Sequence, residues 1–258
     1  DDAMLRTIHH GTHIEGNELS LKQVQQVLDG ERVVARDRDV QEVINYRKVV
    51  DYIGRMKDAP IDEATITDLH KIVVEKILDL DSRGEYRKKE VVIRNSITGE
   101  ISFRPPKSVE VPWQIKELLL FIQQEKELHS VLKAGIVHYE FVRIHPFIDG
   151  NGRVGRALSM LVLFKEGYDI VIGSRKGREG APLIRKAMAY GFSLLRLLVL
   201  RLPYRDTQCG FKAFNKEAAR KVFKKMKIFS EKIRTSGSSV SAGFDLEILY
   251  LARKLKLR

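Results

Sequence analysis

The chain has 258 residues, which is enough for one large domain or two small ones, and 43% of them are apolar. Its single cysteine, Cys209, excludes an intrachain disulfide and indicates a reducing compartment. The apolar run at 192–202 is interrupted by Arg196 and Arg201, so it is too short and too charged to span a bilayer. The first residues do not have the pattern of a signal peptide, and we expect a cytoplasmic protein.

The net charge of +12 is distributed unevenly along the chain. Residues 1–170 contain 25 Lys+Arg and 28 Asp+Glu, a net of −3, whereas residues 171–258 contain 21 and 6, a net of +15. This asymmetry indicates two segments with different partners or different origins. The basic tail could contact an anionic membrane surface peripherally, although a solvated basic face is the commoner outcome, and no specific nucleic-acid partner is expected.

The first third of the chain has the patterns of a small helical domain. Gly16-Asn17 ends the first helical segment, and Ser20 with Gln23 forms a capping box before a short amphipathic helix. Apolar residues at helical spacing predict a longer helix over 39–57, and Thr65 is expected to cap the next helix.

The central part contains the only clear strands of this helical region. Residues 90–94 and 100–104 predict a β-hairpin, because a turn-forming Asn-Ser-Ile-Thr-Gly segment joins them. A lone hairpin is marginally stable, so it must pack on a helix or offer its edge to a partner. Ser108 is expected to begin a helix that runs to about Gln124, and a second helix is predicted from Ser130 to Val142.

The most informative stretch is residues 145–156, His-Pro-Phe-Ile-Asp-Gly-Asn-Gly-Arg-Val-Gly-Arg. Gly150 and Gly152 permit a tight turn, and Asn151 can cap the helix that follows. The first amides of a helix have no internal partner, and together with the helix dipole they form an anion site.

The charged side chains of this stretch fit phosphate chemistry. Arg153 and Arg156 lie on neighbouring positions of the first helical turn, where they can bind phosphate oxygens. Asp149 is a hard oxygen ligand suited to magnesium, and His145 can exchange a proton near neutral pH. The stretch therefore predicts a phosphate-transfer site, with a helix cap and solvated arginines as the alternative.

The remaining histidines have simpler interpretations. His9, His10 and His13 could suggest a metal cluster, but no fourth ligand stands at a known spacing. His138 lies in an apolar helix and is expected to be a hydrogen-bonded packing residue.

The 145–156 motif resembles the signature of the Fic family at every specified position, and the resemblance extends over about residues 4–168. It implies a mainly α Fic-type domain over 1–168 that transfers AMP from ATP to a protein hydroxyl of Ser, Thr or Tyr. It further implies a β-hairpin flap at 90–104 that docks the protein target by strand addition. A homodimer is left open.

The resemblance also implies a role for each motif residue. His145 would be the general base, Asp149 the magnesium ligand, and Arg153 and Arg156 the phosphate-binding arginines. Gly150, Asn151 and Gly152 would form the anion hole for ATP.

Ile14-Glu15-Gly16-Asn17 resembles the inhibitory motif of the family. By this resemblance, Glu15 would pair with Arg156 and deny it to the γ-phosphate, and it could also align a water for AMP removal. The family usually has Ser or Thr four residues before the glutamate, whereas Gly11 stands there in this chain. The alternative is a solvated carboxylate at a helix end.

Residues 169–258 resemble the C-terminal half of family 2 (polyprenyl-phosphate) glycosyltransferases, on the segments 169–175, 205–212 and 243–247. The resemblance implies a smaller α/β fragment. From the residues themselves we expect a short buried strand at 170–172 and an amphipathic helix pair over 183–202. The half of such enzymes that binds the nucleotide sugar is not recognisable in this sequence. The acidic residues Asp206, Asp245 and Glu247 would therefore have no donor site beside them. Two alternatives to AMP transfer therefore stay open: a glycosyltransferase fragment, or an inactive Fic chimera that lacks the adenine pocket.

Overall fold

The structure is a computed structural model that describes residues 2–56, 59–95, 98–172, 191–193, 196–197, 199–202, 204, 212–226 and 244–258. The chain divides into two compact units, one of residues 8–167 and the other of residues 1–7 and 168–258. The predicted helix pair at 183–202 and the segment 205–211 lie mostly outside the described residues. Among the described helices, none is long and apolar enough to cross a membrane.

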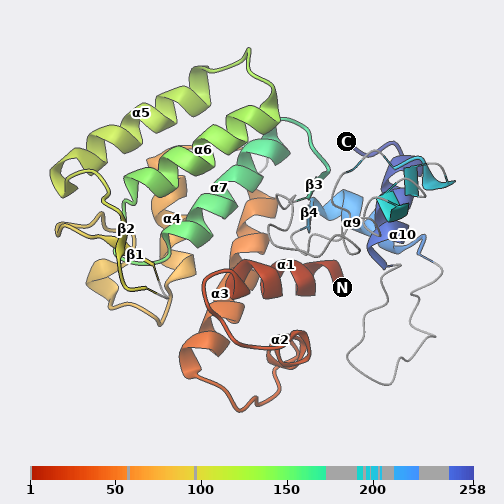
Figure 1. Cartoon of the computed structure of the whole chain (residues 1–258), viewed down its shortest axis with the longest axis horizontal. Helices are drawn as coiled ribbons and strands as arrows, with labels where there is room; N and C mark the ends of the chain where they lie inside the picture. The colour runs from red at the N-terminus through yellow and green to blue at the C-terminus, as the bar shows by residue number, and fades with distance from the viewer. Residues whose placement is uncertain are drawn as a thin grey trace. The chain divides into compact units, whose positions relative to one another are not determined.

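The 8–167 unit is mainly helical (Figure 1). Its helices are α1 (Asp2–His13, shared with the other unit), α2 (Leu21–Leu28), α3 (Asp37–Arg55), α4 (Glu63–Val73), α5 (Val111–Gln124), α6 (Ser130–Ile144) and α7 (Asn151–Lys165). Two short 3-10 helices, η1 (Leu80–Ser82) and η2 (Ser108–Glu110), lie between them. The two strands are β1 (Ile93–Arg94) and β2 (Ile101–Phe103).

Helix α7 is the central element of this unit. Its sequence is apolar on nearly every side, and a helix with that pattern is normally buried on all sides. It packs most extensively on α6 and also contacts α4 and α3, and Figure 1 shows α5, α6 and α7 running side by side. Val154, Leu158 and Leu161 of α7 are fully buried. The start of α7 is therefore held by packing on several neighbours.

The predicted capping box of α2 is confirmed, since the Ser20 side chain accepts from the Gln23 amide and the Gln23 side chain accepts from the Ser20 amide. The prediction for Thr65 was wrong. Asp62 caps α4 and accepts from the Thr65 amide at 2.8 Å, whereas Thr65 is the third helical residue and closes the box in return. Ser108 begins the 3-10 helix η2, and α5 follows it from Val111.

The hairpin is present but shorter than predicted. Ile93 pairs with Phe103 and Arg94 with Ile101 in antiparallel register, with an irregularity between the two pairs. The hairpin leaves β2 exposed along its length, which is consistent with a marginal element that lies on the surface of a helical domain.

The other unit contains β3 (Ile170–Ile172), β4 (Lys212–Phe214), α9 (Lys216–Phe223) and α10 (Phe244–Lys254). The strand predicted at 170–172 is found there and pairs antiparallel with β4. Val222, Ile248 and Ala252 form a small buried core against which Ile170 and Phe214 pack. Asn215 caps α9 and also donates to Asp169 at 2.8 Å.

Candidate functional site

His145 ends helix α6 in the left-handed conformation, with φ +53° and ψ +58°. A non-glycine residue in this region costs free energy, and such residues cluster at functional sites. Its amide donates to Phe141 at 3.0 Å, and its Nδ1 lies 3.3 Å from the Val142 carbonyl. Because a carbonyl only accepts, Nδ1 carries the hydrogen and Nε2 keeps its lone pair. Burial lowers the pKa of His145, against the opposing effect of the Val142 hydrogen bond, so the ring is held as a neutral base.

The loop that follows is locked by Asn151, which does not cap α7 as predicted. Gly150 is the capping residue, with φ +77°, and a Cβ there would lie 2.9 Å from a methyl group of Val73. Asn151 is the first helical residue, and its side chain accepts from the Phe147 amide at 2.9 Å and donates to the Phe147 carbonyl at 2.8 Å. This pair fixes the turn that presents the first amides of α7.

Glu15 lies against this helix start and engages both arginines of the motif. Its Oε1 accepts from Arg156 at 2.9 Å, and its Oε2 is 3.2 Å from Nε of Arg153 in an ion pair that lacks hydrogen-bond alignment. A Cβ on Gly152 would lie 1.9 Å from Oε1 of Glu15, so glycine is required for this approach. The Glu15 carboxylate is therefore the anion at the helix start in this structure.

The glycine at position 11 has a packing reason. A Cβ on Gly11 would lie 2.5 Å from the buried ring of Tyr46, and the Gly11 carbonyl accepts from Arg156 at 2.8 Å. Thr12 is buried and donates to the Ile8 carbonyl at 3.0 Å. The departure from the usual Ser or Thr at this position thus accompanies close packing of α1 on α3.

Asp149 lies beside the helix start and is fully engaged by donors. Its Oδ1 accepts from the Gly150 amide at 2.6 Å and from Arg153 at 3.2 Å, and its Oδ2 accepts from Arg38 at 2.5 Å. Burial raises the pKa of this carboxyl, but the charges of Arg153 and Arg38 outweigh it, and the net effect is a lowered pKa.

Asp149 suits magnesium on chemical grounds. Magnesium bound with substrate phosphates needs only one or two carboxylates, and the Asp149 side chain is ionised and 26% exposed. Over the described ranges, no group of three or more His, Cys, Asp and Glu side chains could hold a metal by itself. His9 and His13 stack on each other with ring centroids 5.4 Å apart.

Helix α3 contributes charged side chains that contact the motif residues, and the sequence analysis did not predict them. Glu42 is buried and lies 3.1 Å from Arg153 NH1 and 3.1 Å from Arg38 Nε, and it accepts from Asn17 at 3.1 Å. Asn17 also donates to the Asp39 carbonyl at 2.9 Å, which anchors the segment that carries Glu15. The sequence does contain a charged cluster, Arg36 to Glu42, at the start of a predicted helix. Because a helix end in solvent has the same pattern, this cluster did not identify Glu42 as a site residue.

Arg87 joins the hairpin to the loop that begins at His145, and the sequence analysis did not predict this contact. Its side chain is fully buried and donates to the carbonyls of His145 at 2.9 Å, Lys89 at 3.2 Å and Pro106. Its own amide donates to the Pro146 carbonyl at 2.8 Å. One guanidinium thus holds both ends of the hairpin segment against the residue that ends α6.

His70 of α4 contacts the loop between α6 and α7 through its ring. Its Nδ1 accepts from the Gly84 amide at 2.9 Å, its Nε2 lies 3.2 Å from the Asp149 carbonyl, and its ring stacks on Phe147 with centroids 3.7 Å apart. Burial lowers its pKa to about 4. Its neutral form satisfies both partners. His138, by comparison, is half-buried against Gly155 of α7, and burial lowers its pKa, which agrees with a packing role.

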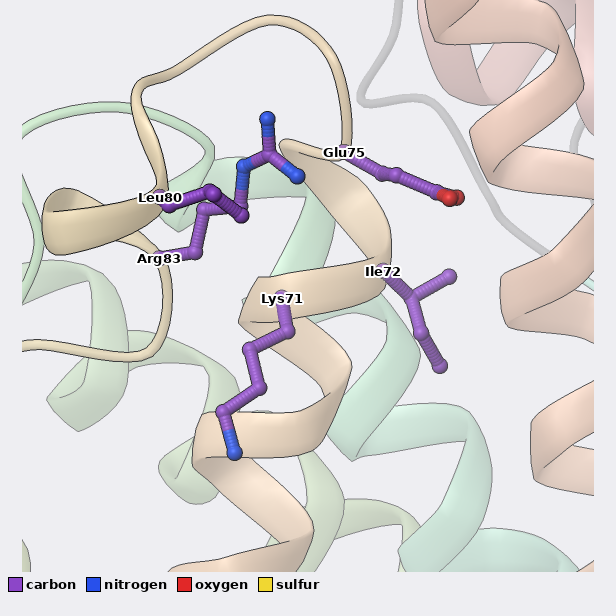
Figure 2. Close-up of a pocket in the computed structure, with 5 residues that line it drawn as sticks. All are labelled: Lys71, Ile72, Glu75, Leu80 and Arg83. Atoms are coloured by element: carbon purple, nitrogen blue, oxygen red, sulfur yellow. The ribbon is translucent and has the colours of Figure 1, made fainter.

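A separate hollow of about 440 Å³ lies beside α4 (Figure 2) and is lined by Lys71, Ile72, Glu75, Leu80 and Arg83. Its charged groups already have partners: Lys71 pairs with Asp68, Glu75 with Lys48, and Arg83 donates to the Leu78 carbonyl. Figure 2 shows the Lys71 and Glu75 side chains extending in different directions. No predicted site residue lines this hollow.

Comparison with known proteins shows what this helical unit is similar to. Residues 60–163 match the model of the Fic/DOC family. The Protein adenylyltransferase Fic of Drosophila mojavensis is 30% identical over 183 residues, which cover 69% of this chain and 35% of that protein. The same enzyme of Drosophila melanogaster is 29% identical over 69% of this chain and 36% of its own length. The chain spans about a third of the length of these curated relatives.

Solved structures give the same result. A Fic family protein from Desulfovibrio desulfuricans is 33% identical with a TM-score of 0.56, over 63% of this chain and 48% of that one. A Fic domain containing signaling protein from Bacteroides thetaiotaomicron is 27% identical with a TM-score of 0.59, over 77% and 72%. Fic-1 from C. elegans is 26% identical with a TM-score of 0.56, over 64% and 48%.

Residues 60–163 of the helical unit, which include the motif at the start of α7, are thus similar to the Fic/DOC family, and the unit resembles solved Fic structures. The curated relatives are named as protein adenylyltransferases. These matches give no support to a glycosyltransferase-like fragment in residues 169–258, which stays a prediction.

Proposed function

We propose that this chain is a protein adenylyltransferase that transfers AMP from ATP to a Ser, Thr or Tyr hydroxyl and is inhibited by its own Glu15. The observation that supports it most is the site itself: a neutral base at His145, an anion site at the start of α7, and Glu15 lying on that anion site. The assignment of the domain to residues 1–168, with a separate fragment at 169–258, is part of the same proposal.

In the proposed reaction the target hydroxyl oxygen attacks the α-phosphorus of ATP, and Nε2 of His145 takes the hydroxyl proton. The bond from the α-phosphorus to the oxygen of the β-phosphate breaks, and pyrophosphate leaves. The amides of Gly150, Asn151 and Gly152 and the guanidinium groups of Arg153 and Arg156 stabilise the phosphate charge. Magnesium at Asp149 supplies further neutralisation of that charge when it is bound.

Glu15 opposes this reaction in two ways. A carboxylate that pairs with Arg156 competes directly with the γ-phosphate for the same donors. The Glu15 carboxylate also lies where a Cβ on Gly152 would meet it, so it competes for the helix start itself. The contact of Glu15 with Arg156 supports the proposal that Glu15 inhibits the site.

We further propose that the protein target docks along the β1–β2 hairpin. Ile101 and Phe103 of β2 are 38% and 39% exposed, and an exposed strand can pair with an extended segment. Arg87 holds the base of this hairpin next to His145, which would bring a docked hydroxyl toward the base.

The test is incubation of the purified chain and a cell lysate with magnesium and ATP labelled in the α-phosphate. Glu15→Gly should label protein strongly, wild type weakly, and Glu15→Gly with His145→Ala roughly 10²–10⁴-fold less than Glu15→Gly. Glu18→Gly is the matched control, because Glu18 lies on the same segment, is 79% exposed and pairs only with Arg36 among the described residues. ATP labelled in the γ-phosphate should give no label.

The alternative functions predict different results in this experiment. If Glu15→Gly binds no ATP by calorimetry and labels nothing, the domain is an inactive Fic chimera without an adenine pocket. Label that persists in the His145→Ala variant would contradict the role of His145.

A further inference from the structure

Arg38 reaches from the first turn of α3 to the carboxylate that is proposed to bind magnesium. Its NH2 donates to Oδ2 of Asp149 at 2.5 Å, across 111 positions of sequence, and its Nε donates to Glu42 at 3.1 Å. The Arg38 side chain is 56% exposed, whereas the Glu42 side chain is 6% exposed. The guanidinium therefore bridges a buried anchor and the Asp149 carboxylate.

The two oxygens of Asp149 are used differently. Oδ1 faces the protein and accepts from Gly150 and Arg153, both of which belong to the fixed start of α7. Oδ2 accepts from Arg38, and it is the oxygen whose donor comes from an exposed side chain. A cation that arrives from solvent would therefore replace Arg38 at Oδ2, leaving the contacts of Oδ1 intact.

A guanidinium and a magnesium ion compete at such an oxygen for two reasons. NH2 of Arg38 already donates to the Asp149 oxygen at which a metal arriving from solvent would bind. A positive group next to the site also repels a divalent cation. The contact of Glu15 with the arginines and the contact of Arg38 with Asp149 do not share an atom, so they can be separated by mutation.

We propose that Arg38 is a second inhibitory residue of this site, which occupies the magnesium position at Asp149 and must leave before metal and nucleotide can bind. This inference rests on the proposed function, because it concerns the same nucleotide site. In this proposal Arg38 blocks the metal position, whereas Glu15 blocks the phosphate position. Removal of Glu15 alone is then expected to open the site only in part.

The test measures binding of ATP by isothermal titration calorimetry, with magnesium and with EDTA, in a Glu15→Gly background. Adding Arg38→Ala should tighten magnesium-dependent ATP binding roughly tenfold, the effect of losing one charged competitor, and should leave binding in EDTA nearly unchanged. Electron paramagnetic resonance of Mn²⁺ with ATP should show the same gain in bound metal. Arg36→Ala is the matched control: Arg36 is 59% exposed, lies two residues away, and pairs with Asp39 and Glu18.

Each result decides the inference. Equal or weaker ATP binding in the Arg38→Ala variant, with magnesium, would overturn it, and weaker binding would make Arg38 a phosphate ligand. A gain of the same size in EDTA or in the Arg36→Ala variant would show a general charge effect and would also overturn it. Failure of every variant to bind ATP would overturn the proposed function together with this inference, whereas binding by Glu15→Gly without an Arg38 effect would overturn the inference alone.

Discussion

At the scale of single residues, the site depends on groups that fix the backbone around His145 and Asp149. His70 is an example, because it satisfies a loop amide and touches the Asp149 carbonyl while its ring packs on Phe147. An imidazole that accepts at Nδ1 cannot be protonated there without losing that bond. His70 is therefore expected to make the stability of the domain depend on pH.

The sign follows from the two pKa values. Burial lowers the pKa of His70 from 6.5 to about 4, so between these values the unfolded chain binds a proton that the folded chain does not. The contribution of neutral His70 to the free energy of unfolding should be complete above about pH 6.5. The free energy of unfolding should then fall by about 3 kcal/mol as the pH approaches 4. Urea unfolding at a series of pH values measures this slope. His70→Gln, which keeps a donor and an acceptor, should flatten it, and an unchanged slope in this variant would contradict the assignment.

At the scale of elements, Arg87 connects the hairpin to the C-terminus of α6. Four backbone carbonyls accept from one buried guanidinium: those of Lys89, Pro106, Ile144 and His145. A buried acceptor that loses its donor costs about 1–3 kcal/mol. The hairpin is short and makes few pairs of its own, so it has little other means of attachment.

Arg87→Ala should lower the free energy of unfolding by about 3 kcal/mol or more, measured by urea unfolding at pH 7. The matched control is Arg94→Ala: Arg94 lies in the same hairpin, is exposed and donates to the Gly99 carbonyl. The control should change stability by about 0.5 kcal/mol or less. Equal effects of the two substitutions would show that the Arg87 contacts do not hold the hairpin.

At the scale of the whole molecule, the chain consists of two compact units that have separate cores. The proposed nucleotide site uses residues of the 8–167 unit alone. A ligand stabilises what it binds, so the two units should respond differently to ATP.

Hydrogen exchange with and without ATP and magnesium, on the Glu15→Gly variant, measures this difference by peptide. Peptides of α4 and α7 should gain protection, while those of α9 and α10 should not change. The same experiment on the His145→Ala variant is the control, because loss of the base should leave nucleotide binding intact. A gain of protection in α9 or α10 would show that residues after 167 take part in the adenine pocket.

Much of this protein could be predicted from the sequence by itself, for reasons of local chemistry. The helical periodicities, the α2 capping box, the β-hairpin and the strand at 170–172 depend on neighbouring residues and are found in the structure. The resemblance of the 145–156 motif to the Fic family could likewise be recognised from the sequence, because its spacing is contained in one turn and one helix, and residues 60–163 match that family.

Only the tertiary structure decided which distant groups meet that motif. Arg38 and Glu42 of α3, His70 of α4 and Arg87 before the hairpin reach it from elements far away in sequence. Asn151 also binds Phe147 instead of capping α7, because packing fixes the loop in a turn that puts Gly150 at the cap. Sequence spacing determines what one turn of helix can present. The partners of buried charges are determined by which helices pack together, and that depends on the whole core.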